Sequence, residues 1–371
     1  MNAFSSPVDV VVAGGGPAGL ATAIAVRRRG LSVVVVDSGT PPIDKACGEG
    51  LMPDGIESLR ELGIVVPPAE YFAFRGIRFL SGGKKAEALF PHGHAFGMRR
   101  TALHRVLTEH ADACGVSMLW QTSVTGLHAD GIRTSRDLIR ARWIVGADGS
   151  NSRVRRWAGL DRQRREGTRF GFRRHYRIEP WSDFMELYWG DECQLYLTPL
   201  GRKEICLASI SSDSHLRVDD ALAQFPDLAA RLKGAEHTSS ERGAITVSRK
   251  LRRVYRERTA LVGDASGGVD AITGEGLCLA FRQAALLADC LAEGDLARYE
   301  IEHRRLIRRP SLMARMMLLM GKHDSLRERT MRAFESKPRS FAGMLAMHVG
   351  EGSVRDFVTN GISLGWQILT A

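Results

Sequence analysis

The chain has 371 residues, of which 44 % are hydrophobic, and it carries a formal net charge of +10 at pH 7. This length suits two domains, or one domain with large insertions, and the composition is that of a globular protein with a hydrophobic core. No fold signature of a nucleic-acid-binding protein accompanies the charge, so we expect no nucleic-acid partner. We expect the basic residues to lie on solvent-exposed faces. The alternatives are that they attract the phosphates of a ligand or an anionic membrane surface.

The cysteines and the apolar runs bear on where the protein works. None of the six cysteines forms a Cys-x-x-Cys pair and no secretory leader precedes them, which predicts reduced thiols in a cytoplasmic protein. The apolar run from Val10 to Val26 contains four glycines and a proline and lacks a basic flank, so it does not match a signal-peptide core. No run is long and apolar enough for a membrane-spanning helix, so we expect at most a peripheral membrane contact.

The most informative segment is Asp-Val-Val-Val-Ala-Gly-Gly-Gly-Pro-Ala-Gly at residues 9–19, followed by a valine-rich strand that ends at Asp37. Its glycines allow a tight turn and a close approach of the backbone to a pyrophosphate, and the helix that begins near Pro17 directs free N–H groups at that phosphate. Asp37 is placed to bind the hydroxyl pair of a ribose, and Gly19 lets the helix pack close to the sheet. The residues predicted to form this adenine-dinucleotide site are Gly14, Gly16, Pro17, Ala18, Gly19, Asp37 and Ser38.

Hydrophobic periodicity predicts the elements that follow. In the first half of the chain they are a short helix at 51–63, strands within 71–98, an amphipathic helix from Thr101 to Cys114, a strand meander from Val116 to Trp143, and a buried strand that runs from Trp143 into a turn at Gly149. Further on they are mainly strands from Arg169 to Ile245 with one helix from Val218 to Leu232, a short buried strand at 259–264, a long helix from Glu275 to Leu291, and a helical, methionine-rich segment from Arg298 to Ala371.

Nucleotide-binding elements thus recur near residues 10, 145 and 262, with strand-rich segments between them. We therefore expect an α/β chain in which one discontinuous dinucleotide-binding domain carries a β-rich second domain inserted in two pieces. The expected boundaries are 1–70, 99–166 and 250–310 for the dinucleotide-binding domain, 71–98 and 167–249 for the second domain, and 311–371 for a C-terminal helical segment.

Two further motifs are Gly-Ala-Asp-Gly-Ser-Asn-Ser-Arg-Val-Arg at 146–155 and Gly-Asp-Ala-Ser-Gly-Gly-Val-Asp-Ala-Ile-Thr-Gly-Glu-Gly at 263–276. Together with the first motif, they resemble the FAD-binding signature set of the flavoprotein superfamily that contains aromatic hydroxylases, flavin halogenases and geranylgeranyl reductases. The resemblance spans residues 8–310 in motif order and spacing, and the helix that starts Arg100-Thr-Ala-Leu103 adds a fourth match. It implies a Rossmann-like FAD-binding domain of the glutathione-reductase type, with an inserted β-rich substrate domain and a helical C-terminus.

The same motifs have a direct physical interpretation. Asp264, at the end of a strand, can accept a hydrogen bond from a ribityl hydroxyl. The N–H groups of residues 274–276 begin a helix and lack partners within it, so at the pyrimidine end of a flavin they would stabilise the negative charge of its reduced form. By resemblance, the turn at 148–149 lies near the pyrophosphate and NAD(P)H, although a simple turn former is the alternative for Asp148. The residues expected to complete the FAD site are Cys47, Gly48, Arg100, Val124, Asp148, Gly149, Arg153, Gly263, Asp264, Gly274, Glu275, Gly276 and Leu277.

Residues 45–51, Lys-Ala-Cys-Gly-Glu-Gly-Leu, resemble the Cys-Gly-x-Gly loop of the geranylgeranyl-reductase branch. The resemblance places Cys47 beside the isoalloxazine and implies catalytic roles for Cys47, Glu49 and Tyr196. A small buried thiol in a glycine turn is the alternative for Cys47.

The chain departs from the family pattern in two places. Ala271 stands where the family commonly has proline, which weakens the case for hydroxylase-style substrate deprotonation by that loop. Residues 194–199, Gln-Leu-Tyr-Leu-Thr-Pro, keep only the proline of the Tyr-x-Trp-x-Phe-Pro stretch that lines the prenyl channel of the reductases. The Trp-x-Trp-x-Ile-Pro pattern of the halogenases is missing as well, so we do not expect halogenation.

These observations predict an FAD-dependent oxidoreductase that consumes NAD(P)H. Because the sequence has no second Gly-x-Gly-x-x-Gly unit, NAD(P)H would meet the flavin only transiently. The altered prenyl-channel stretch favours a monooxygenase that hydroxylates an apolar or aromatic metabolite. The alternatives are reduction of carbon–carbon double bonds in a prenyl or quinone lipid, as in geranylgeranyl reductases, and a flavin-binding carrier or sensor without turnover. We expect no metal, since His92 and His94 lack a third ligand at a suitable spacing; the substrate and the oligomeric state stay open.

The C-terminal segment carries methionines at helical spacing, namely Met313, Met316, Met317 and Met320. Such a stripe fills a core more often than it lines a channel, but flexible thioethers also suit a site for a long apolar ligand. We therefore predict an apolar substrate tunnel between the β-rich domain and these helices, opening beside Cys47, with Tyr196 and Tyr188 in its wall. Nearby arginines would hold the helices against an anionic membrane in which the ligand resides.

Overall fold

The three nucleotide-binding segments of the sequence lie side by side in one sheet. The structure, a computed structural model, describes residues 6–351. The central strand β1 pairs in parallel with β2 on one side and with β11 on the other, and β8 and β19 extend the two sides, also in parallel. The valine runs of β1 and β2 are almost entirely buried, as expected for parallel strands covered on both faces. The strands of this sheet are β1 Val8–Ala13, β2 Val33–Val36, β8 Ser117–Leu119, β9 Val124–His128, β10 Gly131–Thr134, β11 Leu138–Gly146, β18 Tyr255–Arg256 and β19 Thr259–Leu261.

Helices enclose the nucleotide-binding sheet, with α1 in the middle. Helix α1 packs against β1, β2, α3 and α7. Its residues 20–26 are all buried, the pattern of a helix enclosed by other elements rather than lying on a surface. Helix α1 begins at Pro17, whose ring favours the first helical position, and α7 ends before Gly294, which adopts a left-handed conformation. The helices of this part are α1 Pro17–Arg28, α2 Pro53–Glu61, α3 Arg100–Ala113, α4 Arg153–Trp157 and α7 Gly276–Glu293.

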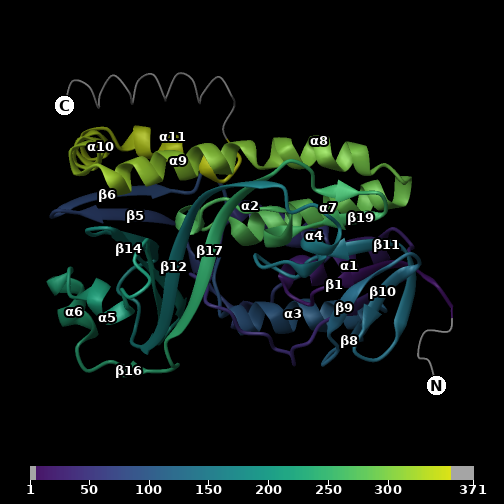
Figure 1. The fold of residues 1–371 in the computed structure, drawn as a ribbon. Coiled ribbons are helices and arrows are strands. Elements are labelled where there is room, and N and C mark those ends of the chain that lie inside the picture. The colour runs from purple at the N-terminus through teal and green to yellow at the C-terminus, as the bar shows by residue number, and fades with distance from the viewer. Residues whose placement is uncertain (1–5, 352–371) are drawn as a thin grey trace.

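A second sheet draws its strands from the two predicted insertions. Strands β5 and β6 come from the first insertion, and β5 pairs in parallel with β13 of the second. The sheet runs in the order β16-β12-β15-β14-β13-β5-β6, with β17 paired to β12. Figure 1 shows the long β12 and β17 on the side of this sheet that is nearer to the nucleotide-binding part. The strands are β5 Gly76–Ser81, β6 Lys84–Leu89, β12 Gln163–Arg177, β13 Phe184–Trp189, β14 Cys193–Gly201, β15 Glu204–Ser211, β16 Glu236–His237 and β17 Arg242–Leu251.

A small third sheet joins the loop at 45–50 to these parts. It has the order β3-β7-β4, with β3 Gly50–Leu51, β7 Ala95–Gly97 and β4 Phe72–Phe74. The predicted α/β fold with a strand-rich insertion and a helical C-terminus is therefore confirmed. The precise domain boundaries stay a prediction.

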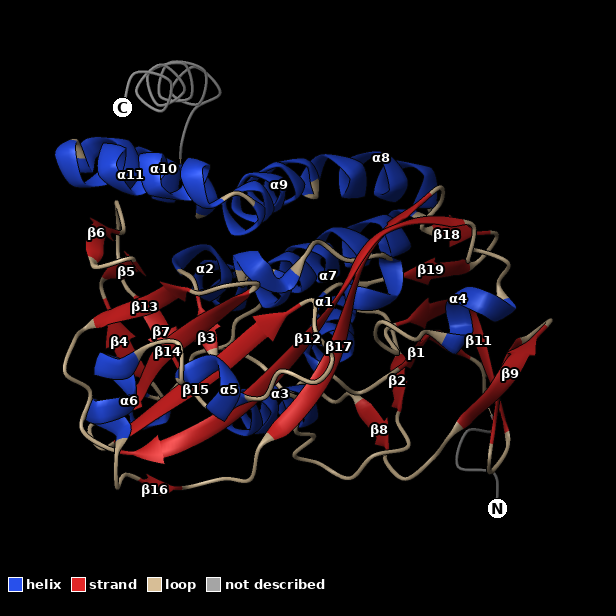
Figure 2. Ribbon diagram, turned by 60° about the vertical axis from the view of Figure 1, so that its left-hand side comes forward, coloured by secondary structure: helices blue, strands red, loops and turns tan. Residues whose placement is uncertain are grey.

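Four C-terminal helices form a layer over both larger sheets (Figures 1 and 2). Helix α9 packs against α8, α10 and α11, and α10 and α11 lie on β6. Among residues 6–351, no helix combines the length and the apolar character needed to cross a membrane. Residues 352–371, the end of the predicted helical segment, lie outside the described part. The helices are α8 Leu296–Leu306, α9 Arg308–Lys322, α10 Asp324–Ser336 and α11 Pro338–His348.

One element differs from the sequence prediction. The single helix expected from Val218 to Leu232 is two short helices, α5 Val218–Leu222 and α6 Pro226–Leu232. The break falls at Phe225, the residue before Pro226, because proline removes a backbone donor and disfavours helical geometry in the residue that precedes it.

Candidate functional site

One cavity brings the predicted site residues together. It has a volume of about 590 Å³ and is lined by all three motifs, by the loop at 45–50 and by strands of the second sheet. The predicted residues in its wall are Gly14, Gly16, Pro17, Ala18, Asp37, Ser38, Cys47, Gly48, Glu49, Arg100, Val124, Asp148, Gly149, Arg153, Tyr196, Gly263, Asp264, Gly274, Glu275, Gly276 and Leu277. Among the residues predicted to bind FAD or to act in catalysis, Gly19 alone does not line the cavity.

The first motif forms the phosphate cradle that its sequence predicts. A Cβ atom on Gly19 would lie 1.8 Å from the carbonyl oxygen of Gly14, so Gly19 serves the close packing of helix on turn. Helix α1 has Gly16 as its N-cap and no side-chain cap, which leaves its first N–H groups available to an anion. At the end of β2, the two carboxylate oxygens of Asp37 accept hydrogen bonds from the N–H groups of Gly15, at 2.6 Å, and Gly39, at 2.7 Å. The carboxylate is thereby fixed at the edge of the cavity.

Arg100 is a buried cation in the cavity wall with spare hydrogen-bonding capacity. Its side chain is buried, and its Nη1 atom has no hydrogen-bond partner among the described residues. Burial lowers the pKa of this guanidinium, because the charged form loses hydration. An unpartnered buried cation in a cradle of glycine turns fits an anionic cofactor, and FAD carries a pyrophosphate. The residues present therefore suit FAD.

The third motif supplies both a carboxylate and a helix terminus. Asp264 lies in the short 3₁₀ helix η2, Gly263–Ser266, where its carboxylate forms an ion pair with Lys45 at 3.1 Å. Gly274 takes the left-handed conformation that turns the chain into α7, and α7 has no side-chain cap at its N-terminus. The N-terminus of α7 thus offers a second set of free N–H groups to the cavity, in addition to those of α1.

We expect Asp264→Ala to weaken FAD binding by about 1–3 kcal/mol, because the ribityl chain would lose a charged hydrogen-bond acceptor. Retention of FAD after dialysis, measured by the ratio of flavin to protein absorbance, checks this. Asp289→Ala is the matched control, since it removes a comparable exposed ion pair, with Arg29 at 2.5 Å, away from the cavity. Equal FAD occupancy in the two variants would show that Asp264 does not hold the cofactor.

In the second motif, the Asp148 side chain forms its hydrogen bonds within its own turn. Its carboxylate accepts hydrogen bonds from the N–H groups of Arg153, at 2.7 Å, and Val154, at 3.1 Å, and so caps α4. The side chain of Asp148 thus has the role of a turn former, and the residue also lines the cavity. The deeply buried Arg155 donates to the carbonyl oxygens of Ser150, at 2.9 Å, and Ala265, at 3.1 Å, and joins the second motif to the third.

A buried polar group behind the third motif was not predicted from the sequence. The side-chain oxygen of Gln283 accepts a hydrogen bond from the N–H of Gly263 at 2.8 Å. The imidazole Nε2 of His303, on α8, lies 2.9 Å from the Ser266 hydroxyl and 3.0 Å from the Gln283 amide nitrogen. These contacts hold the 263–266 turn in place. His303 sits beside a run of arginines in the sequence, so periodicity alone gave no sign that it faces inward.

Two of the three residues predicted to be catalytic, Cys47 and Tyr196, line the cavity as neutral side chains. The Tyr196 hydroxyl donates to the carbonyl oxygen of Ile272 at 2.7 Å, and burial raises its pKa. The Cys47 thiol accepts a hydrogen bond from the N–H of Glu49 at 3.3 Å, and burial together with the Glu49 charge raises its pKa. Because both groups keep their protons at neutral pH, neither can act there as a ready-made anionic nucleophile.

We expect Cys47→Ser to cause a moderate loss of turnover. A purely packing role would leave the rate within a few fold, whereas loss of an acid–base group costs about 100-fold. Steady-state rates of the FAD-loaded protein across pH measure the effect. Cys114→Ser, at a thiol that does not line the cavity, is the control. A wild-type rate for Cys47→Ser at every pH would remove Cys47 from the mechanism.

The predicted substrate tunnel is wrong for the described part of the C-terminal segment. No residue of 311–351 lines the cavity, and Met313, Met317 and Met320 are buried in the main hydrophobic core. Tyr188 is not a wall residue either, since its hydroxyl donates to Glu186 at 2.6 Å and its ring packs on Phe225 in a separate cluster. The apolar wall comes instead from the second sheet and neighbouring loops, through Met52, Phe172, Met185, Ala208, Ile210, Ile245 and Val269.

Comparison with known proteins identifies the family. The family model described as an FAD binding domain matches residues 7–294. The chain is 28 % identical over 318 residues to menaquinone reductase of Mycobacterium tuberculosis, a match that covers 78 % of each chain. It is 32 % identical over 165 residues to rifampicin monooxygenase of Streptomyces venezuelae, covering 41 % of this chain and 34 % of that protein.

The fold is also that of a solved flavoprotein. A flavoprotein/dehydrogenase from Cytophaga hutchinsonii matches with a TM-score of 0.80 at 20 % identity, over 93 % of each chain. The identity is low, so this likeness speaks for the fold alone. With the three motifs gathered around one cavity, the matched domain over residues 7–294 settles the family. The chain belongs to the FAD binding domain family and is an FAD-dependent oxidoreductase.

Proposed function

We propose that the protein uses NAD(P)H to reduce an apolar quinone or prenyl lipid at its flavin. The observation that carries this proposal is the likeness to menaquinone reductase over most of both chains, whereas the likeness to the monooxygenase covers less than half of this one. The apolar wall contributed by Met52, Phe172 and Met185 supports a lipophilic substrate beside the loop at 45–50. Sequence alone favoured hydroxylation, and the extent of the match to the reductase reverses that order.

The chain's own residues would hold FAD in an extended pose across the cavity. The N-terminus of α1 and Arg100 would bind the pyrophosphate, and Asp37 the adenosine ribose. Asp264 would accept from the ribityl chain, and the N-terminus of α7 would stabilise negative charge at the pyrimidine end. The chemistry that FAD would supply when bound is two-electron transfer between NAD(P)H and the substrate. The apolar wall would orient the substrate and keep water away from the reacting atoms.

Two observations bear on where NAD(P)H would bind. Residues 6–351 contain no second dinucleotide-binding βαβ unit, so the donor would enter the flavin cavity itself. Lys45 and Arg153 are exposed cations in its wall and would attract the donor's phosphates.

Monooxygenation of an apolar or aromatic metabolite is the second candidate, supported by the 32 % identity to the rifampicin monooxygenase. One experiment separates the two. The FAD-loaded protein is reduced without oxygen and mixed with a short-chain menaquinone, a prenyl alcohol or a phenol, with and without ¹⁸O₂. Flavin reoxidation by the lipid without oxygen, with a product two hydrogens heavier, supports the reductase. Incorporation of ¹⁸O into a product supports the monooxygenase and contradicts the first proposal.

A further inference from the structure

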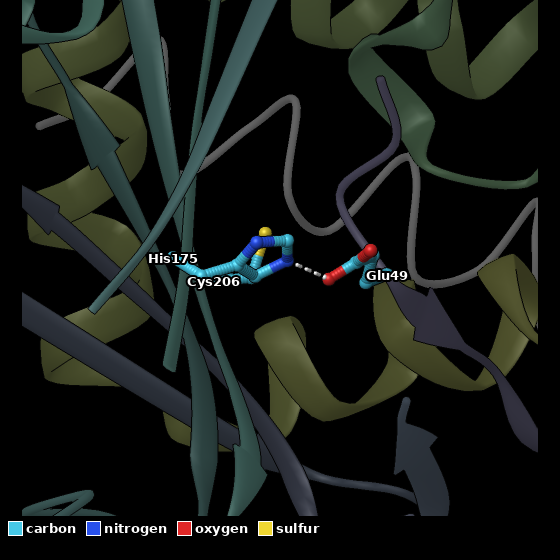
Figure 3. A group of neighbouring side chains, drawn as sticks. All are labelled: Glu49, His175 and Cys206. Carbon is cyan, nitrogen blue, oxygen red and sulfur yellow. Dashed lines mark hydrogen bonds and ion pairs between the residues drawn. The ribbon is translucent and has the colours of Figure 1, made fainter. Parts of the chain in front are cut away.

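A buried group of polar side chains lies directly behind the loop that carries Cys47. Glu49 comes from this loop, His175 from β12 and Cys206 from the paired position on β15 (Figure 3). All three are buried. The Nε2 atom of His175 lies 2.6 Å from a carboxylate oxygen of Glu49, and the other carboxylate oxygen accepts from the backbone N–H of Arg100 at 2.8 Å.

The contacts of His175 fix where its proton lies. Its Nε2 faces a carboxylate, which can only accept, so this nitrogen carries the hydrogen. Its Nδ1 faces three groups that can donate: Arg99 Nη1 at 2.9 Å, Arg173 Nη1 at 3.1 Å and the hydroxyl of Ser239 at 2.7 Å. A neutral imidazole with its N–H toward an acid and its lone pair toward a hydroxyl is arranged to pass a proton on.

The same three side chains lie close enough together for a cation, but their neighbours oppose one. The guanidinium groups of Arg99 and Arg173 reach Nδ1 of His175, and a divalent ion would be repelled by both. Burial raises the pKa of the Cys206 thiol well above its usual value, which makes its deprotonation by a metal ion more costly. Other charged and titratable groups surround Glu49 and His175. They are Asp44, Cys47, Arg99, Arg100, Arg173, Glu204 and Cys206.

The two ends of the group lie in different surroundings. Ser239 is half-buried next to the exposed Ser240, so its hydroxyl can exchange with water. Glu49 lines the cavity next to Cys47 and is one of the few residues other than glycine with a left-handed backbone, at φ 59°. Such a conformation costs free energy and persists where the surroundings hold it for a purpose.

We propose that Ser239, His175 and Glu49 form a relay that carries protons from solvent into the flavin cavity beside Cys47. In one passage, the O–H bond of Ser239 breaks as an N–H bond forms at Nδ1 of His175. The N–H bond at Nε2 breaks as an O–H bond forms on Glu49. Water returns a proton to Ser239, and Glu49 releases its own into the cavity. No electron moves. One proton is transferred inward, the donor water is left as hydroxide in solvent, and the His175 ring must turn its new N–H from Nδ1 back to the Nε2 position before the next passage. The relay requires that the cavity binds a flavin, as the proposed function states. It does not depend on which of the two candidate reactions the protein catalyses.

The test uses a reaction that needs a proton but no substrate and no NAD(P)H. Reduced methyl viologen, a one-electron donor whose oxidation releases no proton, supplies the two electrons that reduce bound FAD, and water supplies the one proton. In a stopped-flow instrument, the loss of oxidised-flavin absorbance reports the electrons, and a pH-indicator dye reports the proton. We expect Ser239→Ala to slow proton uptake about tenfold and Glu49→Gln about 100-fold, the lower end of what a lost acid–base group costs. The control Ser240→Ala changes an exposed neighbour and should behave as wild type.

A second readout does not depend on the reaction. In ¹⁵N-histidine-labelled protein, with the signal assigned by its loss in His175→Gln, the relay requires a neutral ring whose hydrogen is on Nε2. Wild-type proton uptake in Ser239→Ala, measured on protein with full FAD occupancy, would overturn the relay, as would an Nδ1–H ring. Zn²⁺ bound at one ion per chain in wild type and lost in His175→Gln would overturn it as well and assign a metal site. Because neither substrate nor NAD(P)H is present, these outcomes are independent of whether the proposed reaction is correct.

Discussion

Replacing Gly19 by alanine is expected to leave the protein without bound FAD. The new Cβ would lie 1.8 Å from the carbonyl oxygen and 3.0 Å from the carbonyl carbon of Gly14, both backbone atoms of the turn that cradles the pyrophosphate. Backbone cannot rotate aside as a side chain can, so α1 must shift away from the turn. Overpacking of this kind costs about 1–3 kcal/mol or more, and here the shift also displaces the helix terminus that binds the phosphate.

The flavin-to-protein absorbance ratio and the melting temperature of purified Gly19→Ala measure the result. Two other glycines give matched controls, because a Cβ at Gly126 or at Gly16 meets no atom within 4 Å. Gly126→Ala, in β9, should keep full FAD occupancy. Gly16→Ala should melt like wild type yet bind FAD more weakly, since only the approach of the phosphate is affected. Full occupancy in Gly19→Ala would show that α1 can pack on the turn in some other way.

Acidification between pH 6.5 and 4 is expected to destabilise the protein through His303. Burial lowers the pKa of this imidazole from 6.5 to about 4. Above pH 6.5 the ring is neutral in both the folded and the unfolded chain, and the protein has its full stability. Below pH 6.5 the unfolded chain takes up the proton first, so stability falls as the pH falls, until the folded protein also binds the proton near pH 4. The two pKa values correspond to a loss of about 3 kcal/mol.

His303→Gln tests this, because glutamine keeps a polar partner for Ser266 but does not titrate. Melting temperatures of the variant should depend less steeply on pH between 6.5 and 4 than those of wild type. On acidification, His303→Gln should also release FAD at a lower pH than wild type does, since His303 and Gln283 support the Gly263 turn. His215→Gln, at an exposed position, is the control and should retain the wild-type slope. Identical slopes for His303→Gln and wild type would mean that other groups cause the acid sensitivity.

The residues of the three motifs that line the cavity were predictable because their relations are local. In the first βαβ unit, Gly14, Gly19 and Asp37 lie within one strand–helix–strand segment whose spacing sets its geometry. The second and third motifs follow strands that pair in parallel with β1 or its neighbour, so their turns meet at the same edge of the sheet. The order of the motifs along the chain was therefore enough to gather them around one cavity.

The parts that were missed depend on register and on tertiary partners. Tyr196 pairs with Leu187 across β14 and β13, so Tyr188, one residue further along β13, points to the other side of the sheet. A shift of one residue exchanges the two faces, and because β13 is buried on both of them its sequence pattern does not distinguish one from the other. His175 likewise meets Glu49 only because β12 runs beneath the loop, more than a hundred residues away in the chain. The methionine spacing of α9 correctly predicts a helix with an apolar side but not the core against which that side packs.

The strand order of the nucleotide-binding sheet also determines when the protein can acquire its cofactor during synthesis. Strand β1 leaves the ribosome first, but β11 and β19, which complete its side of the sheet, are made much later. The cavity further needs α7 and the support of His303 on α8, near the end of the chain. The nascent chain must therefore keep the valine-rich β1 and β2 shielded by chaperones or by partial collapse until that point. We therefore expect FAD to bind only after α7 and α8 have been synthesised, because these helices complete the cavity and support its third motif.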